Sequence, residues 1–186
     1  MIDDIRQDAS KRMAKTVEAT RDEMGRIRTG RASTALLEHL TVDYYGVATP
    51  INQVATIAVA DARTLTVQPW EKKMMEAIEK AVLESDLGLN PVSAGAVMRI
   101  PLPPMTAERR RELAKLVKRE GENGKVAVRN IRRDAIHMVR ELLKEKAISQ
   151  DQEKQAEAAL QTLTDEHVGA IEQIVHDKEK EVVEVQ

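Results

Sequence analysis

The sequence VAVRNIRRDA at residues 126–135 decides the fold, because it carries an apolar face and a basic face on one helical segment. Around it, apolar and small residues recur at alternating steps of four and three, which is typical of a helix packed in a bundle or coiled coil. These seam positions are Val117, Gly121, Gly124, Val128, Ile131, Ala135, Met138 and Leu142. We therefore expect one long helix from residue 106 to about residue 146, buried along this seam.

The same helix carries a basic ridge, which we expect to lie opposite the seam and away from neighbouring helices. Its members are Lys125, Arg129, Arg132, Arg133 and Arg140. Arginine binds phosphate through a planar, two-pronged donor group, so the ridge favours nucleic-acid binding. No aromatic residue interleaves with it, which disfavours stacking on single-stranded bases and favours recognition of duplex RNA through phosphates and 2′-hydroxyls. The alternative is a solvated charged face without a ligand.

The composition limits the classes of protein to consider. Of 186 residues, 32% are charged and 2% aromatic, which favours long helices over an aromatic-rich β fold. The absence of cysteine excludes disulfides, thiolate metal sites and cysteine nucleophiles. Neither a basic leader followed by an apolar run nor about 18 consecutive apolar residues is present, so we expect a cytoplasmic protein without membrane association.

Charge is distributed unevenly although the net charge is only −2. Residues 106–146 hold thirteen Lys/Arg against seven Asp/Glu, a net +6, whereas residues 147–186 hold three against ten, a net −7. Either the two segments pair along their flanks, or the protein has a basic side for nucleic acid and an acidic side turned away.

Two further helices complete a predicted three-helix bundle, built from residues 1–30 and 106–186. The first spans residues 2–29 and is expected to end at Gly30. The last is opened by a capping box of Ser149 and Gln152 after a tight turn at residues 144–148. Its predicted seam is Ala156, Leu160, Leu163, His167, Ile171, Ile174 and Val182.

Residues 31–105 read as a small α/β domain inserted into the bundle, so the fold class is α+β. Alternating or β-branched runs predict strands, and a run with apolar residues at helical spacing predicts one short helix. The strands are expected at residues 40–45, 54–59, 64–67 and 97–102, and the helix at residues 71–84.

Two short junctions, at residues 28–32 and 102–106, connect the halves and predict a hinge. Glycine lies in the first and a proline pair in the second, which stiffens the local chain so that bending occurs beside it. The hinge residues are Thr29, Gly30, Arg31, Pro103, Pro104 and Met105. The alternative is that the small domain is simply inserted at these junctions and that the junctions do not bend. Gly121 and Gly124 likewise have two interpretations, close approach of a neighbouring helix or a kink.

No catalytic or metal-binding arrangement is visible in the sequence, and we expect neither enzymatic activity nor a cofactor. There is no glycine-rich phosphate loop with its lysine, and none of the four histidines forms a zinc-protease pair. An enzyme that uses the carboxylates of the last helix would need a pocket that the sequence does not show.

Five sequence blocks, in this order, resemble the signature of bacterial ribosome recycling factor. They are RIRTGRAS at residues 26–33, DYYG at 43–46, SDLGLNP at 85–91, RIPLPP at 99–104 and VAVRNIRRDA at 126–135. The resemblance spans essentially the whole chain.

The resemblance implies an L-shaped molecule in which a three-helix bundle carries a β/α/β sandwich domain on a flexible double hinge. It implies a non-catalytic, monomeric factor that binds the post-termination ribosome and separates its subunits with elongation factor G and GTP. In that family the bundle contacts large-subunit ribosomal RNA and the second domain meets elongation factor G. The matching RNA-binding positions here are Arg132, Arg129, Arg133, Arg110 and Arg28. A helical scaffold or chaperone-like protein that binds proteins through its seams is the rival hypothesis, and it predicts binding that is insensitive to salt.

Overall fold

The computed structural model describes residues 1–184, and this part of the chain divides into two compact units. The first unit contains Met1–Arg28 and Glu108–Val182, and the second is made mainly of Thr29–Ala107. A long three-helix bundle and a small domain with a β-sheet are therefore combined in one chain, which confirms the predicted fold class.

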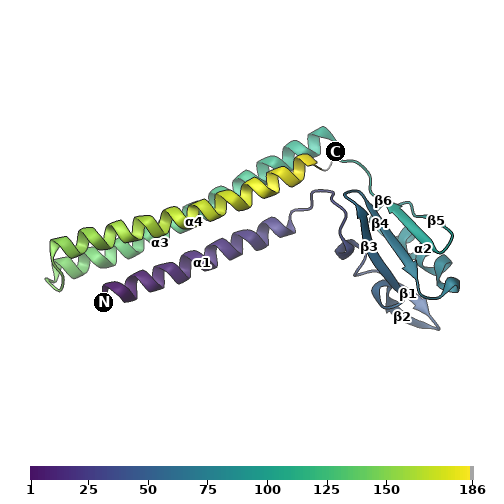
Figure 1. Ribbon diagram of the computed structural model, residues 1–186, viewed down its shortest axis with the longest axis horizontal. Coiled ribbons are helices and arrows are strands. Elements are labelled where there is room, and N and C mark those ends of the chain that lie inside the picture. Colours follow the sequence, from purple (N-terminus) through teal and green to yellow (C-terminus); the bar gives the residue numbers. More distant parts are fainter. Residues whose placement is uncertain (185–186) are drawn as a thin grey trace. The chain divides into compact units, whose positions relative to one another are not determined.

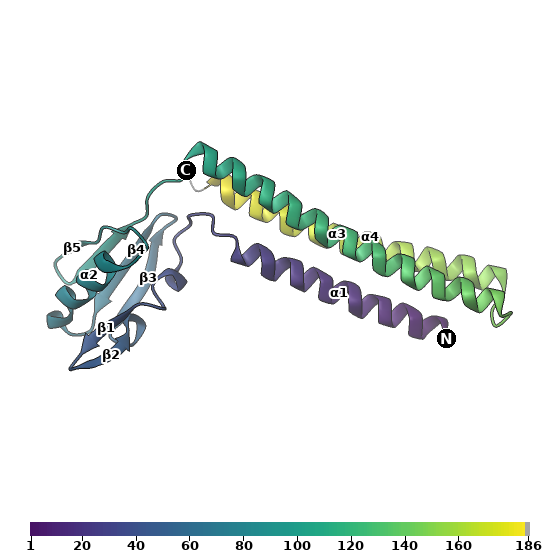
Figure 2. The same ribbon diagram turned by 180° about the vertical axis from the view of Figure 1, so that it is seen from behind.

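The first unit consists of α1 (Ile2–Arg26), α3 (Ala107–Lys144) and α4 (Gln150–Glu184), which run lengthwise beside one another (Figures 1 and 2). Contacts along α3 meet residues of falling number on α4, so these two helices are antiparallel. The pairs are Gly121–Val175, Lys125–Glu172, Arg132–Gln161 and Arg140–Glu157. Helix α1 is antiparallel to α3 as well, because Thr20 lies against Gly124 and Arg12 pairs with Asp134.

The buried side of α3 follows the predicted seam for most of its length and then departs from it. Val117 and Val128 are fully buried, but Met138 is 45% exposed and Val139 is buried in its place. A strict seven-residue repeat drifts by about 20° per heptad on a straight helix, so over the three heptads from Val117 the drift reaches about 60° and the next residue lies nearer the inward direction. The prediction of Met138 on the seam is therefore wrong.

The two glycines of α3 are points of close helix approach. A methyl group on Gly121 would overlap Cγ2 of Val175 on α4. On Gly124 it would lie 2.5 Å from Oγ1 of Thr20 and 3.2 Å from Cδ1 of Ile171. Because α3 continues as one helix through both positions, close approach is the correct interpretation.

The ends of the helices differ in how well the sequence predicted them. The capping box is confirmed, since the backbone N–H of Ser149 donates to Gln152 and that of Gln152 donates to Ser149 Oγ. Helix α1, however, ends at Arg26, and Ile27 is already extended. Gly30 has φ +78°, so its left-handed conformation serves the connection that follows rather than the helix end.

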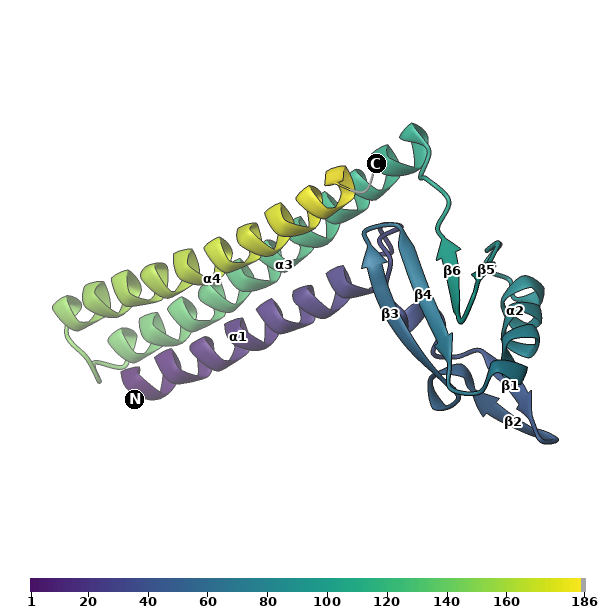
Figure 3. The same ribbon diagram turned by 45° about the vertical axis from the view of Figure 1, so that its right-hand side comes forward.

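The second unit contains a four-stranded antiparallel sheet and a separate hairpin (Figure 3). The sheet order is β3 (Ala55–Asp61), β4 (Thr64–Pro69), β6 (Val97–Pro101) and β5 (Val92–Ala94). The hairpin joins β1 (Thr41–Tyr44) to β2 (Val47–Pro50). The sequence did not predict β2 and β5, because both are short and neither alternates between buried and exposed residues.

Helix α2 (Met75–Glu84), preceded by a 3₁₀ turn at Lys72–Met74, helps to form the core of this unit. Its Ile78 and Val82 are fully buried in one cluster with Leu65 and Val67 of β4. Helix α2 also contacts β1, so the hairpin and the sheet share a single core with the helix.

The packing of Gly124 generates a stability prediction. Alanine is favoured over glycine in a helix by about 1 kcal/mol, but overpacking a filled interface costs about 1–3 kcal/mol. We expect Gly124→Ala to lower the free energy of unfolding by up to about 2 kcal/mol, the difference between these two terms, measured by urea titration followed by circular dichroism at 222 nm.

The matched control is Gly169→Ala on α4, where nothing lies within 4 Å of the added carbon. This variant should be more stable than the wild type by up to about 1 kcal/mol. Equal stability of the two variants would contradict close packing at Gly124.

Candidate nucleic-acid interface

The basic ridge of α3 is not one uniform face opposite the seam, and that prediction is wrong. Lys125 is mostly covered, with its Nζ 3.4 Å from Oε1 of Glu172 on α4. Arg140 likewise lies 2.9 Å from Oε1 of Glu157 on α4. At 100° per residue these positions flank the seam rather than oppose it, so α4 reaches them. Pairing between the basic and acidic helices accounts for this part of the charge.

Arg132 also faces α4, but it meets an amide instead of a carboxylate. Its Nη1 donates to Oε1 of Gln161 at 3.0 Å. Gln161 in turn donates from Nε2 to Oδ1 of Asp165 at 2.9 Å, which fixes the amide with its oxygen toward Arg132. The guanidinium is therefore held in place by a neutral acceptor and keeps its full charge and its remaining donors.

Arg129 and Arg133 are exposed and point away from the bundle seam. Among residues 1–184, none forms a hydrogen bond or ion pair with either side chain. Arg133 follows Arg132 directly and Arg129 lies one turn before, so three guanidinium groups are presented along about one turn of a single helix. This is the largest concentration of uncompensated positive charge that the ridge offers.

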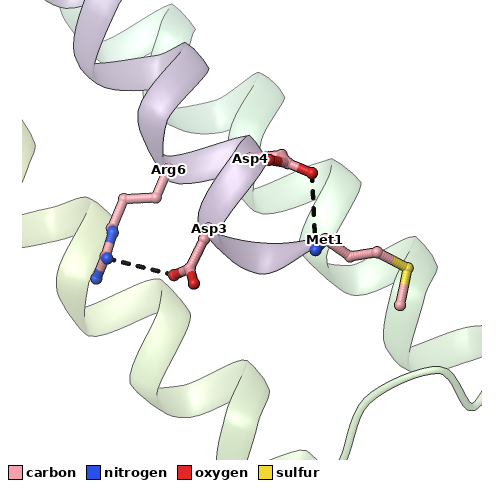
Figure 4. Close-up of polar contacts among 4 residues, drawn as sticks. All are labelled: Met1, Asp3, Asp4 and Arg6. Atoms are coloured by element: carbon pink, nitrogen blue, oxygen red, sulfur yellow. Dashed lines mark hydrogen bonds and ion pairs between the residues drawn. The ribbon is translucent and has the colours of Figure 1, made fainter.

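Three arginines of α1 contrast with this arrangement, because each pairs with an acidic residue three positions earlier on the same helix. Figure 4 shows Arg6 reaching Asp3, with 3.3 Å between Nη2 and Oδ1, beside the Met1 amine and Asp4. Arg21 with Glu18 and Arg26 with Glu23 repeat the pattern. These three arginines thus add little to a phosphate-binding surface.

Arg28 and Arg110, the other two predicted RNA-binding residues, lie apart from the Arg129–Arg133 group. Arg110 is nineteen residues before Arg129 on α3, which corresponds to about 28 Å along the axis. Arg28 is exposed and lines a hollow of about 390 Å³ together with Arg109 of the same unit. The predicted RNA-binding residues therefore lie along the length of the bundle and do not form one pocket.

Three further exposed basic residues, which were not predicted from the sequence, lie toward the start of α3. They are Arg111, Lys115 and Lys118. They follow the same helical spacing as Arg129 and Arg133, and Glu122 interrupts the series between the two groups. The alternating spacing of four and three residues that predicts the seam also predicts the face on which these three residues lie.

At the predicted hinge, both connections are attached to one turn of the second unit. The backbone N–H of Ala32 donates to the carbonyl of Ala62 at 2.8 Å, and that of Leu102 donates to the carbonyl of Arg63 at 2.7 Å. Asp61 stabilises this turn because its Oδ1 accepts from the backbone N–H of Arg63 at 2.9 Å. The two connections therefore leave the sheet from one fixed place.

The pKa of Asp61 reports the same hydrogen bonds. The Arg63 backbone N–H, followed by the Thr64 hydroxyl, holds the pKa of this carboxyl below its ordinary value. A lowered folded-state pKa means that the stabilisation is complete above the ordinary carboxyl pKa and is lost as the pH falls through the lowered one.

The hinge residues outside these attachments differ in exposure. Arg31, Pro103 and Pro104 are exposed, whereas Thr29 is only 3% exposed. Gly30 packs against Met105, and a methyl group on it would lie 3.1 Å from Met105 Cγ. The two connections thus touch each other as well as the turn.

Other kinds of site are not formed by the described part of the chain. No cluster of three or more histidine or carboxylate side chains suitable for a metal ion occurs among residues 1–184. Over the same residues, none of the helices has the length and apolar character needed to cross a membrane.

Comparison with known proteins shows the family of this chain. The family model described as ribosome recycling factor matches residues 20–183. This chain belongs to the ribosome recycling factor family. The ribosome-recycling factor of Legionella pneumophila (strain Paris) is 55% identical over 185 residues, which cover all of both chains. That of Nitrosococcus oceani is 52% identical and covers all of this chain and 99% of its own.

Solved structures of recycling factors have the same fold. One solution structure of a ribosome recycling factor matches with a TM-score of 0.68 at 44% identity, covering 99% of this chain and 98% of that one. The T. thermophilus recycling factor, solved as a model with E. coli elongation factor G bound to the E. coli post-termination complex, gives 0.62 at 43% identity. It covers 98% of both chains.

The contact between Gln161 and Arg132 generates a prediction for RNA binding. In Gln161→Ala, the guanidinium of Arg132 loses its fixed position and must be ordered on binding. We expect affinity for purified large ribosomal subunits to fall roughly two- to fivefold, measured by co-sedimentation at constant salt.

Gln173→Ala provides the control, since Gln173 makes the same type of bond to Asp177 on α4 at 2.8 Å and accepts no hydrogen bond from a basic residue of α3 among residues 1–184. A similar loss in both variants would show that the effect comes from α4 itself and not from Arg132.

The turn at Asp61 generates a prediction for the hinge. Asp61→Ala removes the acceptor that fixes the turn, so the amides of Ala32 and Leu102 should exchange hydrogen faster than in the wild type. Amide exchange followed by NMR measures this directly. Asp43→Ala removes a comparable bond, to the Gly46 N–H at 2.7 Å in the β1–β2 turn, and should leave both amides unchanged. Unchanged exchange in Asp61→Ala would contradict the attachment.

Proposed function

We propose that this chain is a translation factor that binds the post-termination ribosome and, with elongation factor G and GTP, separates the two subunits. The observation that carries the proposal is the group formed by Arg129, Arg132 and Arg133, presented on one side of a tightly packed bundle. Membership of the recycling factor family and the neighbour bound to a post-termination complex with elongation factor G support it.

The bundle would anchor the factor on ribosomal RNA of the large subunit. Arg132 is the first candidate contact, with Arg129 and Arg133 beside it and with Arg110 and Arg28 farther along the bundle. Guanidinium groups bind phosphate oxygens in pairs, and helical RNA presents phosphates at regular spacing. A rigid row of such groups recognises shape and charge and needs no base contacts.

The second unit would act as the part that moves. In this proposal, residues 1–30 and 106–186 form the anchoring domain, residues 31–105 form the moving domain, and residues 28–32 and 102–106 form the hinge. The attachments at Ala32 and Leu102 support this division, because bending is then confined to the few residues outside them. Elongation factor G would push the second unit while the bundle stays bound.

The factor itself would not be a catalyst. GTP hydrolysis would belong to the partner, and this chain would act as a monomer in the cytoplasm, where ribosomes terminate translation. Its contribution would be mechanical, the transfer of the partner's movement to a contact between the subunits.

The proposal predicts a strong and salt-dependent effect of Arg132→Ala. Each phosphate contact that is lost reduces the slope of log affinity against log salt by about one. Loss of a charge-assisted bond should weaken binding to large subunits at least about tenfold. Binding is measured across a salt series, with circular dichroism to confirm folding, and Arg132→Lys should recover only part of the affinity because lysine cannot bind in two-pronged fashion.

Arg21→Ala is the matched control, since Arg21 is an exposed arginine of the same bundle that is paired with Glu18. It should bind like the wild type. If Arg132→Ala also binds like the wild type, with the same salt slope, the basic group is only a solvated face. Binding that does not respond to salt would favour a protein-binding scaffold instead.

A further inference from the structure

All three aromatic residues of the sequence gather in one part of the second unit. Tyr44 ends the first strand of the hairpin, Tyr45 begins the turn after it, and Trp70 follows β4. The hydroxyls of Tyr44 and Tyr45 donate to the two carboxylate oxygens of Glu71, at 2.7 and 3.2 Å. The two tyrosine rings meet edge to face with their centres 4.6 Å apart. We call Tyr44, Tyr45 and Trp70 the aromatic face.

Tyr45 is held in an unfavourable backbone conformation although most of its side chain is in solvent. Its φ is +51° in the two-residue turn between β1 and β2, and the side chain is 68% exposed. A bulky residue in the left-handed region costs about 1–3 kcal/mol and is concentrated at binding sites. Lys73 lies over its ring, with 4.0 Å from Nζ to the ring centre, and fixes the side chain further.

Trp70 is also exposed and fixed. The residue is 63% exposed, and its Nε1 donates to Oγ1 of Thr56 at 2.9 Å. Trp70 lines two hollows, of about 320 and 360 Å³. An exposed tryptophan whose orientation is already set loses little entropy on binding, which is characteristic of residues that dominate protein interfaces.

The charges around Trp70 indicate what would bind there. Glu38 lines one hollow and Glu71 the other, and the described residues that line either hollow include no lysine, arginine or histidine. Lys73 lies 3.3 Å from Glu71 and offsets part of its charge, so Glu38 is the less compensated of the two. A carboxylate in each hollow repels phosphates and attracts cations, and tryptophan is the best aromatic partner for a cationic side chain.

We propose that the aromatic face, with Glu38 and Glu71, binds an arginine- or lysine-bearing segment of elongation factor G. This proposal rests on the proposed function, because it names the surface through which that partner acts on the second unit. A basic side chain would stack on Trp70 with its charge toward Glu38, while the apolar stem packs beside Tyr45. The bundle then binds RNA through cations, and the second unit binds protein through aromatics and carboxylates.

The test compares subunit separation at increasing concentrations of elongation factor G, with GTP and post-termination ribosomes. For Trp70→Ala and Glu38→Lys, we expect the concentration of elongation factor G for half-maximal separation to rise at least about tenfold. Trp70→Phe should recover much of the loss, and Glu38→Gln should give a smaller loss than Glu38→Lys. Leu83→Ala, at a 53% exposed apolar residue of α2, is the control and should behave like the wild type.

Binding of each variant to ribosomes without elongation factor G separates the possible sources of an effect. The proposal requires this binding to stay at the wild-type level. Weaker binding without elongation factor G would overturn it in favour of a ribosomal contact, and wild-type separation by all variants would overturn it outright. If the wild type itself does not separate subunits, the proposed function fails instead. Glu38→Lys and Trp70→Phe keep the test decisive should Trp70→Ala not fold.

Discussion

The close approach of α1 and α4 to α3 at Gly121 and Gly124 is the constraint on which the rest of the bundle depends. Without side chains there, α3 packs directly on Val175 from one helix and on Thr20 from the other. Packed interiors transmit strain instead of absorbing it. A helix fixed on two sides presents its outer residues at constant spacing, which is what recognition of a repeating phosphate backbone requires.

The neighbour helices also determine which cations remain available. Helix α4 neutralises Lys125 and Arg140 with carboxylates but meets Arg132 with an amide. The amide of Gln161 positions the guanidinium of Arg132 without cancelling its charge, whereas a glutamate at this position would neutralise that charge. The division of charge along the chain therefore has two physical roles, stabilising the bundle at its flanks and leaving a basic group outside them.

Much of this arrangement is contained in local sequence, and the remainder depends on distant contacts. The spacing of Val117 and Val128 predicts the buried side of α3, and Ser149 with Gln152 predicts the start of α4. The buried position moves from Met138 to Val139 because of helix geometry. Predicting this move requires knowing over how many residues the helix stays straight. The bond from Arg132 to Gln161 depends on the rotation of a second helix, which no local pattern specifies. Strands β2 and β5 have too few residues to show a period. The attachments at Ala62 and Arg63 are hydrogen bonds between backbone groups, so the types of the side chains do not reveal them.

The central claim is that the outer side of α3 lies on large-subunit ribosomal RNA. Because the sequence has no cysteine, Val126→Cys gives a single attachment point on that side, at a residue that is 50% exposed and close to Arg129. An iron–EDTA probe placed there should cleave large-subunit RNA at a few defined positions in post-termination ribosomes, whereas the same probe at Gln173→Cys on α4 should cleave elsewhere or weakly. Equal cleavage from both positions, or none from residue 126 in a variant that still binds, would contradict the account.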